Sequence, residues 1–259
     1  MSTPNRLPVP EDLRAEVEQA QRLGVAIYLQ DIASAIATDV ARARLGPSDG
    51  RSVAGYLAIR EAPGDAPTDT RLVWFFTAAD PPEIVCRVRV PMRPRGEPTF
   101  EVSAPRVPVP PDAQPLIRAR RTALAALGAP AQPQNPVVLP GSAIGHDGIL
   151  VHLLAGSPRS DVAVLGKHHR VLISPDGATV IKLEPLSRSA IEIPLHSPDM
   201  PPGSVSAGLS ITHLVSACPV ETHVFASLLH QTPVFVGTGR GVWCVEGDQI
   251  SFLGQQPPA

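Results

Sequence analysis

The stretch VLISPDGATVIKL, residues 171–183, is the clearest local pattern in the chain. Two runs rich in Val, Ile and Leu flank Pro175, Asp176 and Gly177. Proline, an aspartate that bonds its own backbone and a glycine that accepts positive φ are the residues that a tight turn needs. The pattern therefore predicts a two-stranded hairpin over 171–183 that turns at 175–177, and with it a fold built on antiparallel sheet.

Strand-like sequence continues on the C-terminal side of this hairpin. Runs at 209–215 and 220–229 have the composition of strands. In TPVFVGTGRGVWCVEGDQISFL, residues 232–253, turns at 237–241 and 247–248 separate three further short strands. We therefore expect all of 221–254 to be sheet, with its dense apolar residues buried on at least one face.

The N-terminal part combines a long helix with a meander. Apolar residues recur at helical spacing over 10–45, with Gly24 a candidate for a break or kink, and LGP at 45–47 is a stop signal. After it, apolar runs broken by Pro, Gly and Asp predict an antiparallel meander. These runs cover 53–60, 71–77, 83–90 and 99–103.

A second helix is expected in the middle of the chain. The proline-rich stretch 104–115 predicts an extended connector, because proline is excluded from central strands. The helix then covers 113–127, with Asp112 as its cap and Gly128 as its end. The overall prediction is an α+β fold: antiparallel sheet in meander order, an N-terminal helix, a second mid-chain helix and a β-rich C-terminal half. We expect one unit over 1–259, with a subdivision into 1–111 and 112–259 as the alternative.

Composition narrows the classes of protein to consider. The chain has 259 residues, 43% of them hydrophobic, and a formal net charge of −2. A sizeable core is therefore expected, and bulk charge gives no support to nucleic-acid binding. The first residues contain no apolar leader, and no run approaches the roughly 18 apolar residues of a membrane span. These features predict a cytoplasmic protein with no membrane contact.

The three cysteines, Cys86, Cys218 and Cys244, are widely spaced and form no CxxC pair. An odd number at such spacing is a poor disulfide framework and a poor zinc site. We expect all three to be reduced and unbridged.

Histidines suggest where a site would lie, because all eight fall between 146 and 230. If 220–229 is a strand, Glu221 and His223 share one face, and His213 on the preceding strand is close enough to pair across the sheet. Two histidines and a carboxylate would suit a catalytic metal. The HxH and HExxH spacings are missing, so hydrogen-bonded strand histidines are favoured, and no metal or cofactor is expected.

The sequence gives even less support to a catalytic nucleophile than to a metal site. The sequence has no GxSxG motif, and GTGRG at 237–241 lacks the lysine and the following helix of a phosphate loop. Cys218 has histidines near it in sequence, and a Cys–His pair can activate a thiolate. A buried, inert thiol is the favoured interpretation of Cys218.

Several phrases resemble a family of uncharacterised bacterial proteins with no assigned reaction. The resemblance implies one continuous α+β unit, and members often look exported, whereas this chain begins without a leader. It selects polar residues to test first: His168, Arg170, His213, Glu221 and His223. The phrases are AIYLQDIASAIATD (26–39), NPVVLPG (135–141), LGKHHRVLISPDGATVIKLEPLSRS (165–189), THLVSACPVETHVFASL (212–228) and PVFVGTGRGVWCVEGDQI (233–250).

Two functional hypotheses follow from the sequence. The leading one is a non-enzymatic binding or interaction protein of a bacterial system, with another protein as its partner; a structural component of an assembly ranks below it. The alternative is a hydrolase, metal-dependent or using a Cys–His pair, at a histidine-bearing sheet. Its candidate residues are His168, Arg170, His213, Cys218, Glu221 and His223.

Overall fold

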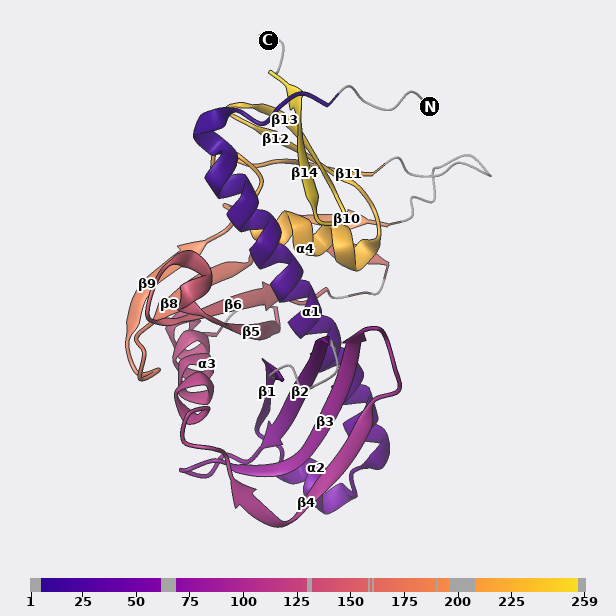
Figure 1. Ribbon diagram of the computed structural model, residues 1–259, viewed down its shortest axis with the longest axis vertical. Helices are drawn as coiled ribbons and strands as arrows, with labels where there is room; N and C mark the ends of the chain where they lie inside the picture. The colour runs from indigo at the N-terminus through magenta and orange to yellow at the C-terminus, as the bar shows by residue number, and fades with distance from the viewer. Residues whose placement is uncertain are drawn as a thin grey trace.

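The computed structural model describes residues 6–61, 69–129, 132–157, 159, 161–189, 191–195 and 208–255. Within this part of the chain, four α-helices combine with fourteen strands, most of them paired antiparallel (Figure 1). The α+β class predicted from the sequence is confirmed, with its N-terminal helix and β-rich C-terminal half.

Helix α1 (Arg14–Arg44) follows the short 3-10 turn η1 (Glu11–Leu13) and runs along the length of the molecule (Figure 1). The predicted helix over 10–45 is confirmed, and it continues through Gly24 without a break. Successive thirds of α1 face three different sheets, so its apolar residues form no single stripe. Its buried contacts are Leu13, Val17 and Ala20 in the C-terminal core, Leu23 and Ile27 in the middle core, and Leu29, Ala33, Ala37 and Ala41 in the N-terminal core.

Gly24 lies where α1 crosses helix α4 (Glu221–His230). A Cβ atom at Gly24 would lie 2.4 Å from the Cβ of Val224 and 2.8 Å from the backbone oxygen of Glu221. Neither atom is the free end of a flexible side chain. The glycine therefore permits the close approach of two helices and does not mark a kink.

Gly24→Ala is expected to lower the free energy of unfolding by about 1–3 kcal/mol, because the added methyl group pushes α4 away from α1. Gly50→Ala is the matched control, since a Cβ at Gly50 in the short helix α2 (Pro47–Ser52) meets no heavy atom within 4 Å. Urea denaturation of both variants checks the prediction. Equal stability of the two variants would show that α1 and α4 are not in tight contact.

The N-terminal sheet is the predicted meander. Its order is β1 (Gly55–Arg60), β2 (Asp69–Phe76), β3 (Glu83–Arg93) and β4 (Thr99–Pro108), all antiparallel. Helix α1 covers one face, against residues such as Val73 and Phe75, and helix α3 packs on the other, against residues such as Phe76. This sandwiching explains why β2 is buried along most of its length.

The prediction of an extended, proline-rich connector over 104–115 is partly wrong. Residues 104–108 belong to β4, the exposed edge strand of the sheet, where a missing backbone N–H costs no ladder hydrogen bond. Helix α3 (Gln114–Leu127) confirms the second predicted helix, and it ends at Gly128 with φ +74°. Asp112 does not cap it, because the N-cap position is Ala113.

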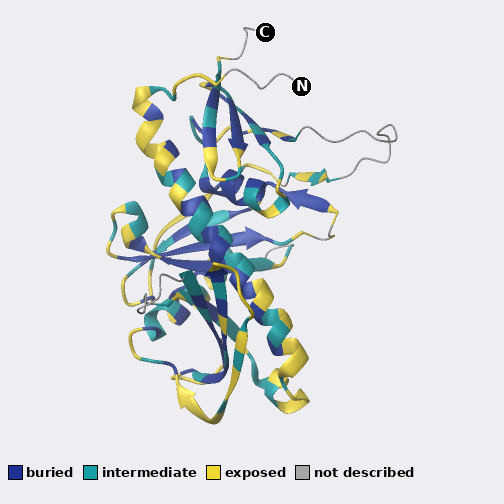
Figure 2. Cartoon of the chain, turned by 45° about the vertical axis from the view of Figure 1, so that its right-hand side comes forward, coloured by how far each residue is buried: buried dark blue, intermediate teal, exposed yellow. Residues whose placement is uncertain are grey.

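The middle sheet has the order β5 (Gln134–Pro140), β6 (Ile149–Ala155), β8 (His169–Ile173) and β9 (Val180–Pro185). The 3-10 turn η2 (Gly141–Ile144) joins β5 to β6. Strands β8 and β9 form the predicted hairpin, with Ile173 opposite Val180 and Gly177 at φ +76° in the turn. Figure 2 shows the contrast between the fully buried strand β6 and the exposed strand β4. A separate pair, β7 (Val162–Val164) with β10 (Glu192–Pro194), lies beside this sheet.

The C-terminal sheet corrects part of the prediction for 221–254. Strands β12 (Val234–Thr238), β13 (Gly241–Glu246) and β14 (Gln249–Gly254) are antiparallel, and both predicted turns are confirmed. Residues 221–230, however, form α4 and not a strand, so the prediction for 220–229 is wrong. The physical reason is that β11 (Leu209–Thr212) pairs parallel with β12, and parallel neighbours need a crossover connection, which α4 provides.

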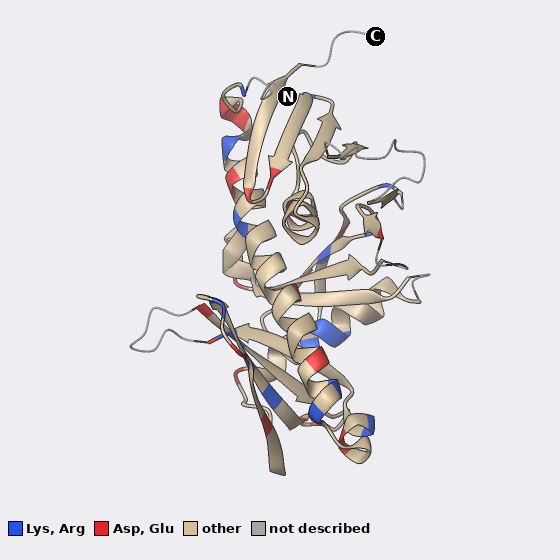
Figure 3. Ribbon diagram, turned by 90° about the vertical axis from the view of Figure 1, so that its right-hand side faces the viewer, with Lys and Arg blue, Asp and Glu red and all other residues tan. Residues whose placement is uncertain are grey.

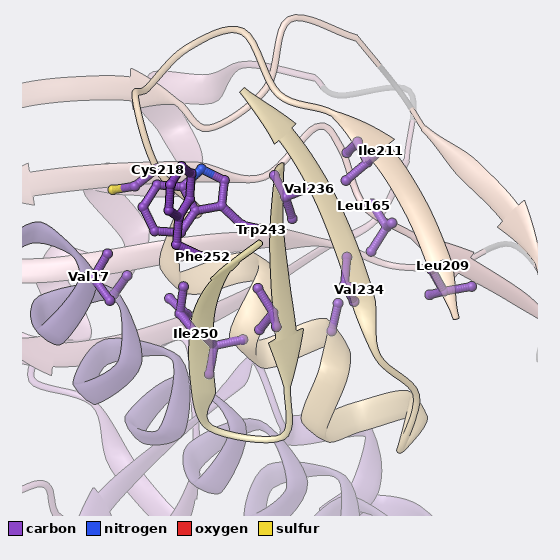
Figure 4. Packing of buried hydrophobic residues seen from close by; sticks show 14 of the residues in the cluster. Val17, Leu165, Leu209, Ile211, Cys218, Val234, Val236, Trp243, Ile250 and Phe252 are labelled. Atoms are coloured by element: carbon purple, nitrogen blue, oxygen red, sulfur yellow. The ribbon is translucent and has the colours of Figure 1, made fainter. Parts of the chain in front are cut away.

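The core beneath this sheet is centred on Trp243, which is fully buried (Figure 4). Its ring lies 4.8 Å, centroid to centroid, from that of Phe252, and its indole N–H donates to Thr238. Cys218 joins the same cluster. All three cysteines are buried free thiols, as predicted.

Two further predictions are not decided by the fold. One core cluster contains residues from both sides of residue 111, and a division of the chain there stays a prediction. Among the described residues, Glu11–Arg44 is the one helix long and apolar enough to cross a membrane, and 44% of its most apolar 18-residue window is buried in the fold. A core helix of a soluble protein passes the same test, so the lack of a membrane span and the cytoplasmic location stay predictions.

Candidate functional site

Glu221 is the centre of a buried polar network that joins three elements. It lies at the start of α4 and is only 2% exposed. Its carboxylate accepts hydrogen bonds from His152 Nε2 at 2.8 Å and from an Arg170 terminal nitrogen at 3.1 Å. His152 on β6 and Arg170 on β8 are direct neighbours across the sheet. The network therefore ties α4 to the middle sheet.

The partners of Glu221 outweigh its burial. Burial alone would raise the pKa of Glu221, but the hydrogen bond from His152 and the electrostatic effects of His152 and Arg170 lower the pKa to about 2. Arg170 Nε also donates to Glu184 on β9 at 3.1 Å. One guanidinium thus serves two carboxylates, and its hydrogen-bonding capacity is directed to the protein itself.

His213 and His223 meet, but from different elements than predicted. His213 follows β11 and His223 lies on α4, and their rings contact edge to face with centroids 4.7 Å apart. Glu221 is directed to other partners. Within the described residues, no group of three His, Cys, Asp or Glu side chains is placed to hold a metal ion.

Each of these histidines has a hydrogen bond that fixes its ring. His223 Nδ1 accepts from the backbone N–H of Val220 and closes the first turn of α4. His213 Nε2 lies 2.7 Å from Ser216 Oγ, whose hydroxyl donates to the backbone oxygen of Cys218. Because that hydroxyl has one proton, His213 is the donor to Ser216 and not a base that activates it.

His168 is buried in a third place, where its Nδ1 accepts from the backbone N–H of Ala155 and its Nε2 donates to the backbone oxygen of Val164. Burial lowers the pKa of His168 to about 4, and burial reinforced by neighbouring histidines lowers the pKa of His223 to about 3. Both rings are therefore neutral at pH 7. Their contacts are those of structural residues.

Cys218 lines a cavity of about 310 Å³ beside the first turns of α1, together with Arg170 and Glu221. Burial raises the pKa of its thiol to about 11, so the nucleophilic thiolate is scarce at neutral pH. In the described part of the chain, no hydrogen bond joins the Cys218 thiol to a histidine ring. The geometry gives the Cys–His hypothesis no support.

A larger cavity, of about 430 Å³, lies beside the edge strand β1, and we call it the α1–β1 cavity. Eight of its eleven lining residues are apolar or proline, and three are polar. The cavity is lined by residues of six elements: α1 (Ala26, Gln30), β1 (Ala58, Ile59, Arg60), β2 (Arg71), α3 (Leu116), β5 (Val138, Leu139, Pro140) and η2 (Ala143).

Two polar side chains in the wall of this cavity are more than nine-tenths buried. Gln30 is 7% exposed; its Nε2 donates to the backbone oxygen of Ala58 at 3.0 Å, and its Oε1 has no partner among the described residues. Arg71 is 5% exposed; one terminal nitrogen binds Asp69, and its Nε has no partner there either. A buried polar atom left unpaired costs about 1–3 kcal/mol. Both atoms are closed to solvent, so a ligand in the cavity would reach them only after a shift of these two side chains.

Sequence reasoning named Glu221 and Arg170 but missed His152, and it missed both buried polar residues of the α1–β1 cavity. His152 is the one polar residue in the strand run ILVHLLA, residues 149–155, which is a usable signal for a buried polar contact. Arg71 alternates with Val73 and Phe75, so its side chain lies on the face of β2 that α1 covers. Gln30 lies between core residues of α1. In each case the signal is a polar residue at a core position.

Comparison with known proteins finds no family model, no curated protein and no solved structure that matches this chain. Function must therefore be argued from the geometry. Lys and Arg are interspersed with Asp and Glu on the side of the molecule shown in Figure 3, so neither sign of charge dominates it.

Proposed function

We propose that the protein is a non-enzymatic binding protein that holds a small amphipathic ligand in the α1–β1 cavity. One observation carries the proposal: a mostly apolar cavity is lined by two buried polar residues, Gln30 and Arg71, and each of them has one polar atom without a partner among the described residues. Ligand pockets combine apolar walls with a few placed polar groups, and their volumes are about 300–1,000 Å³. The cavity, at about 430 Å³, lies within that range.

The Glu221 network supports a binding protein over an enzyme. Its carboxylate and guanidinium bond each other, His213 and His223 are held by Ser216 and by the backbone, and the nearby thiol is protonated. His152 Nδ1 has no partner among the described residues, but the other groups of the network are bonded by the protein, and such groups position elements of the fold. We therefore assign the network to stability and the α1–β1 cavity to function.

The remaining expectations from the sequence stay proposals. A protein partner, the lack of nucleic-acid and membrane contacts and a cytoplasmic location are compatible with a small-ligand binding protein. Binding of a small molecule beside β1 would give such a partner a ligand-dependent surface to recognise.

Filling the cavity is expected to weaken binding of an amphipathic probe. Ala26 and Ala143 line the cavity and are half-buried, so Ala26→Leu with Ala143→Leu removes volume without disturbing a fully buried position. With anilinonaphthalene sulfonate as the fluorescent probe, we expect one site per chain and a loss of affinity of about tenfold in the double variant.

Ala15→Leu is the matched control, because Ala15 is exposed on the same helix and does not line the α1–β1 cavity. This variant should bind the probe as the wild type does. A wild-type protein that does not enhance the fluorescence, or a double variant with unchanged affinity, would refute the proposed function.

A further inference from the structure

We infer that the ligand of the α1–β1 cavity is an organic anion: an apolar chain or ring with a carboxylate head and a hydrogen-bond donor beside it. The inference rests on the proposed function, and it specifies the chemical class of the ligand. It is argued from the charges of the residues that line the cavity and from the unpaired polar atoms of two of them.

The polar end of the cavity has an excess of positive charge. Arg60 and Arg71 both line the cavity, and both pair with the same carboxylate, Asp69. Glu61, the residue that follows β1, is bound to Arg89 at 2.9 Å. Among the described residues, two guanidinium groups share one carboxylate here, so their charges sum to +1, which favours an anionic ligand and disfavours a cationic one.

Arg71 is the residue that we expect to contact the head group. Its side chain is 6% exposed, compared with 68% for Arg60, so its interactions with a ligand are screened much less by water. Asp69 occupies a terminal nitrogen and leaves the Nε–H free. Charge-assisted hydrogen bonds from Arg to carboxylate have donor–acceptor distances of about 2.7–2.9 Å and are stronger than neutral ones.

Gln30 requires a donor from the ligand. Its amide orientation is fixed, because turning the amide over would place its oxygen against the backbone oxygen of Ala58, which now accepts from Nε2. Oε1 is therefore the atom that is unpaired. A hydroxyl or an amide N–H near the carboxylate would satisfy it. Medium-chain hydroxy acids have these features: an apolar chain, a carboxylate and a donor beside it.

Isothermal titration with four probes of equal chain length tests the inference: octanoate, 3-hydroxyoctanoate, octan-1-ol and octylamine. We expect octanoate to bind about tenfold or more tightly than octanol, because a hydrogen bond to a charged group is added. The hydroxy acid should bind tightest and the amine weakest.

Variants locate the head group. Arg71→Met should abolish the preference for acid over alcohol while octanol binding changes by less than about twofold, since the apolar walls remain. Gln30→Met should remove only the advantage of the hydroxy acid. Arg89→Met, on the exposed face of β3, is the control that keeps both preferences. Arg71→Gln, which keeps a donor without the charge, replaces Arg71→Met if the latter does not fold.

The outcomes separate the two proposals. If octanol binds wild type as tightly as octanoate, or if the acid preference survives the loss of Arg71, the anion inference is wrong and the proposed function stands. If none of the four probes binds, both fail.

Discussion

Acidification from pH 6.5 to pH 4 is expected to lower the free energy of unfolding by about 3 kcal/mol, because two buried histidines bind protons only after the chain unfolds. His168 and His223 have pKa values of about 4 and about 3 in the fold, against 6.5 in the unfolded chain. The unfolded state therefore binds more protons in this window. Their contribution to stability is complete above pH 6.5 and is lost as the pH falls.

Asp31 opposes this effect and sets the net slope. Burial raises the pKa of Asp31 from 3.8 to about 6, although the hydrogen bond from Asn135 lowers it in part. Between these values the folded state binds one proton that the unfolded state lacks. The unfolded state binds about two more protons than the folded state at the two histidines and about one fewer at Asp31. The net difference of about one proton corresponds to about 1.4 kcal/mol for each pH unit. Below pH 4.5, Glu221 adds to the loss, because its pKa in the fold is about 2.

His223→Gln is expected to reduce this slope by about one proton. Glutamine at this position of a helix start keeps an acceptor for the backbone N–H of Val220 but does not titrate. His146→Gln is the control, because His146 is half-exposed and its ring accepts from Gly148 N–H in a turn. Urea titrations at half-unit pH steps give the slope. A slope in His223→Gln equal to that of wild type would contradict the assignment of a buried neutral ring.

Glu221→Ala is expected to cost about 3–5 kcal/mol at pH 7, because removing one partner of a buried ion pair leaves the other charge uncompensated. Arg170 would lose one of its two carboxylates, and His152, which is fully buried, would lose the partner of its Nε2. Glu221→Gln should cost less, since its side-chain oxygen still accepts a hydrogen bond.

Glu184→Ala is the matched control for this prediction. Glu184 binds the same arginine, but its side chain is 30% exposed, and ion pairs of that kind contribute about 0–1 kcal/mol. Urea denaturation of the three variants at pH 7 gives the comparison. If Glu221→Ala loses no more stability than Glu184→Ala, the network does not hold α4 on the middle sheet.

Elements whose partners are local in sequence could be predicted from the sequence. The hairpin at 175–177 is fixed by a turn whose Gly177 has positive φ, and the meander β1–β4 by short connections between alternating runs. Helix α1 was predicted from its spacing, although successive thirds of its length pack on three different sheets. These patterns report local geometry, which does not depend on what the element packs against.

Helix α4 was missed because most of it is buried on all sides, so its sequence lacks the periodic alternation of apolar and polar residues that predicts a helix. Residues 221–227 are all buried, so no polar face alternates with an apolar one, and Thr, His, Val and Phe in sequence resemble a strand. The parallel pairing of β11 with β12 depends on this helix, and it was missed with it. The error also placed His213, Glu221 and His223 on one sheet, which created the metal hypothesis.

The α1–β1 cavity could not be predicted, because its wall comes from six elements that meet only in the folded chain. Arg71 and Gln30 are about 40 residues apart, and neither lies in a motif. Their one sequence signal is a polar residue at a core position, which is shared by His152, a residue of the Glu221 network. A ligand contact can be distinguished from an internal hydrogen bond only when the hydrogen-bond partners of each polar atom are known, and these are given by the folded structure.

A crystal structure of the protein with 3-hydroxyoctanoate at saturating concentration tests the binding proposal most directly. The account predicts the ligand in the α1–β1 cavity, with its carboxylate at hydrogen-bond distance from Arg71 Nε, its hydroxyl at Gln30 Oε1, and its chain against Ile59 and Leu139. A ligand bound elsewhere on the chain, or a cavity that holds only water under these conditions, would contradict it.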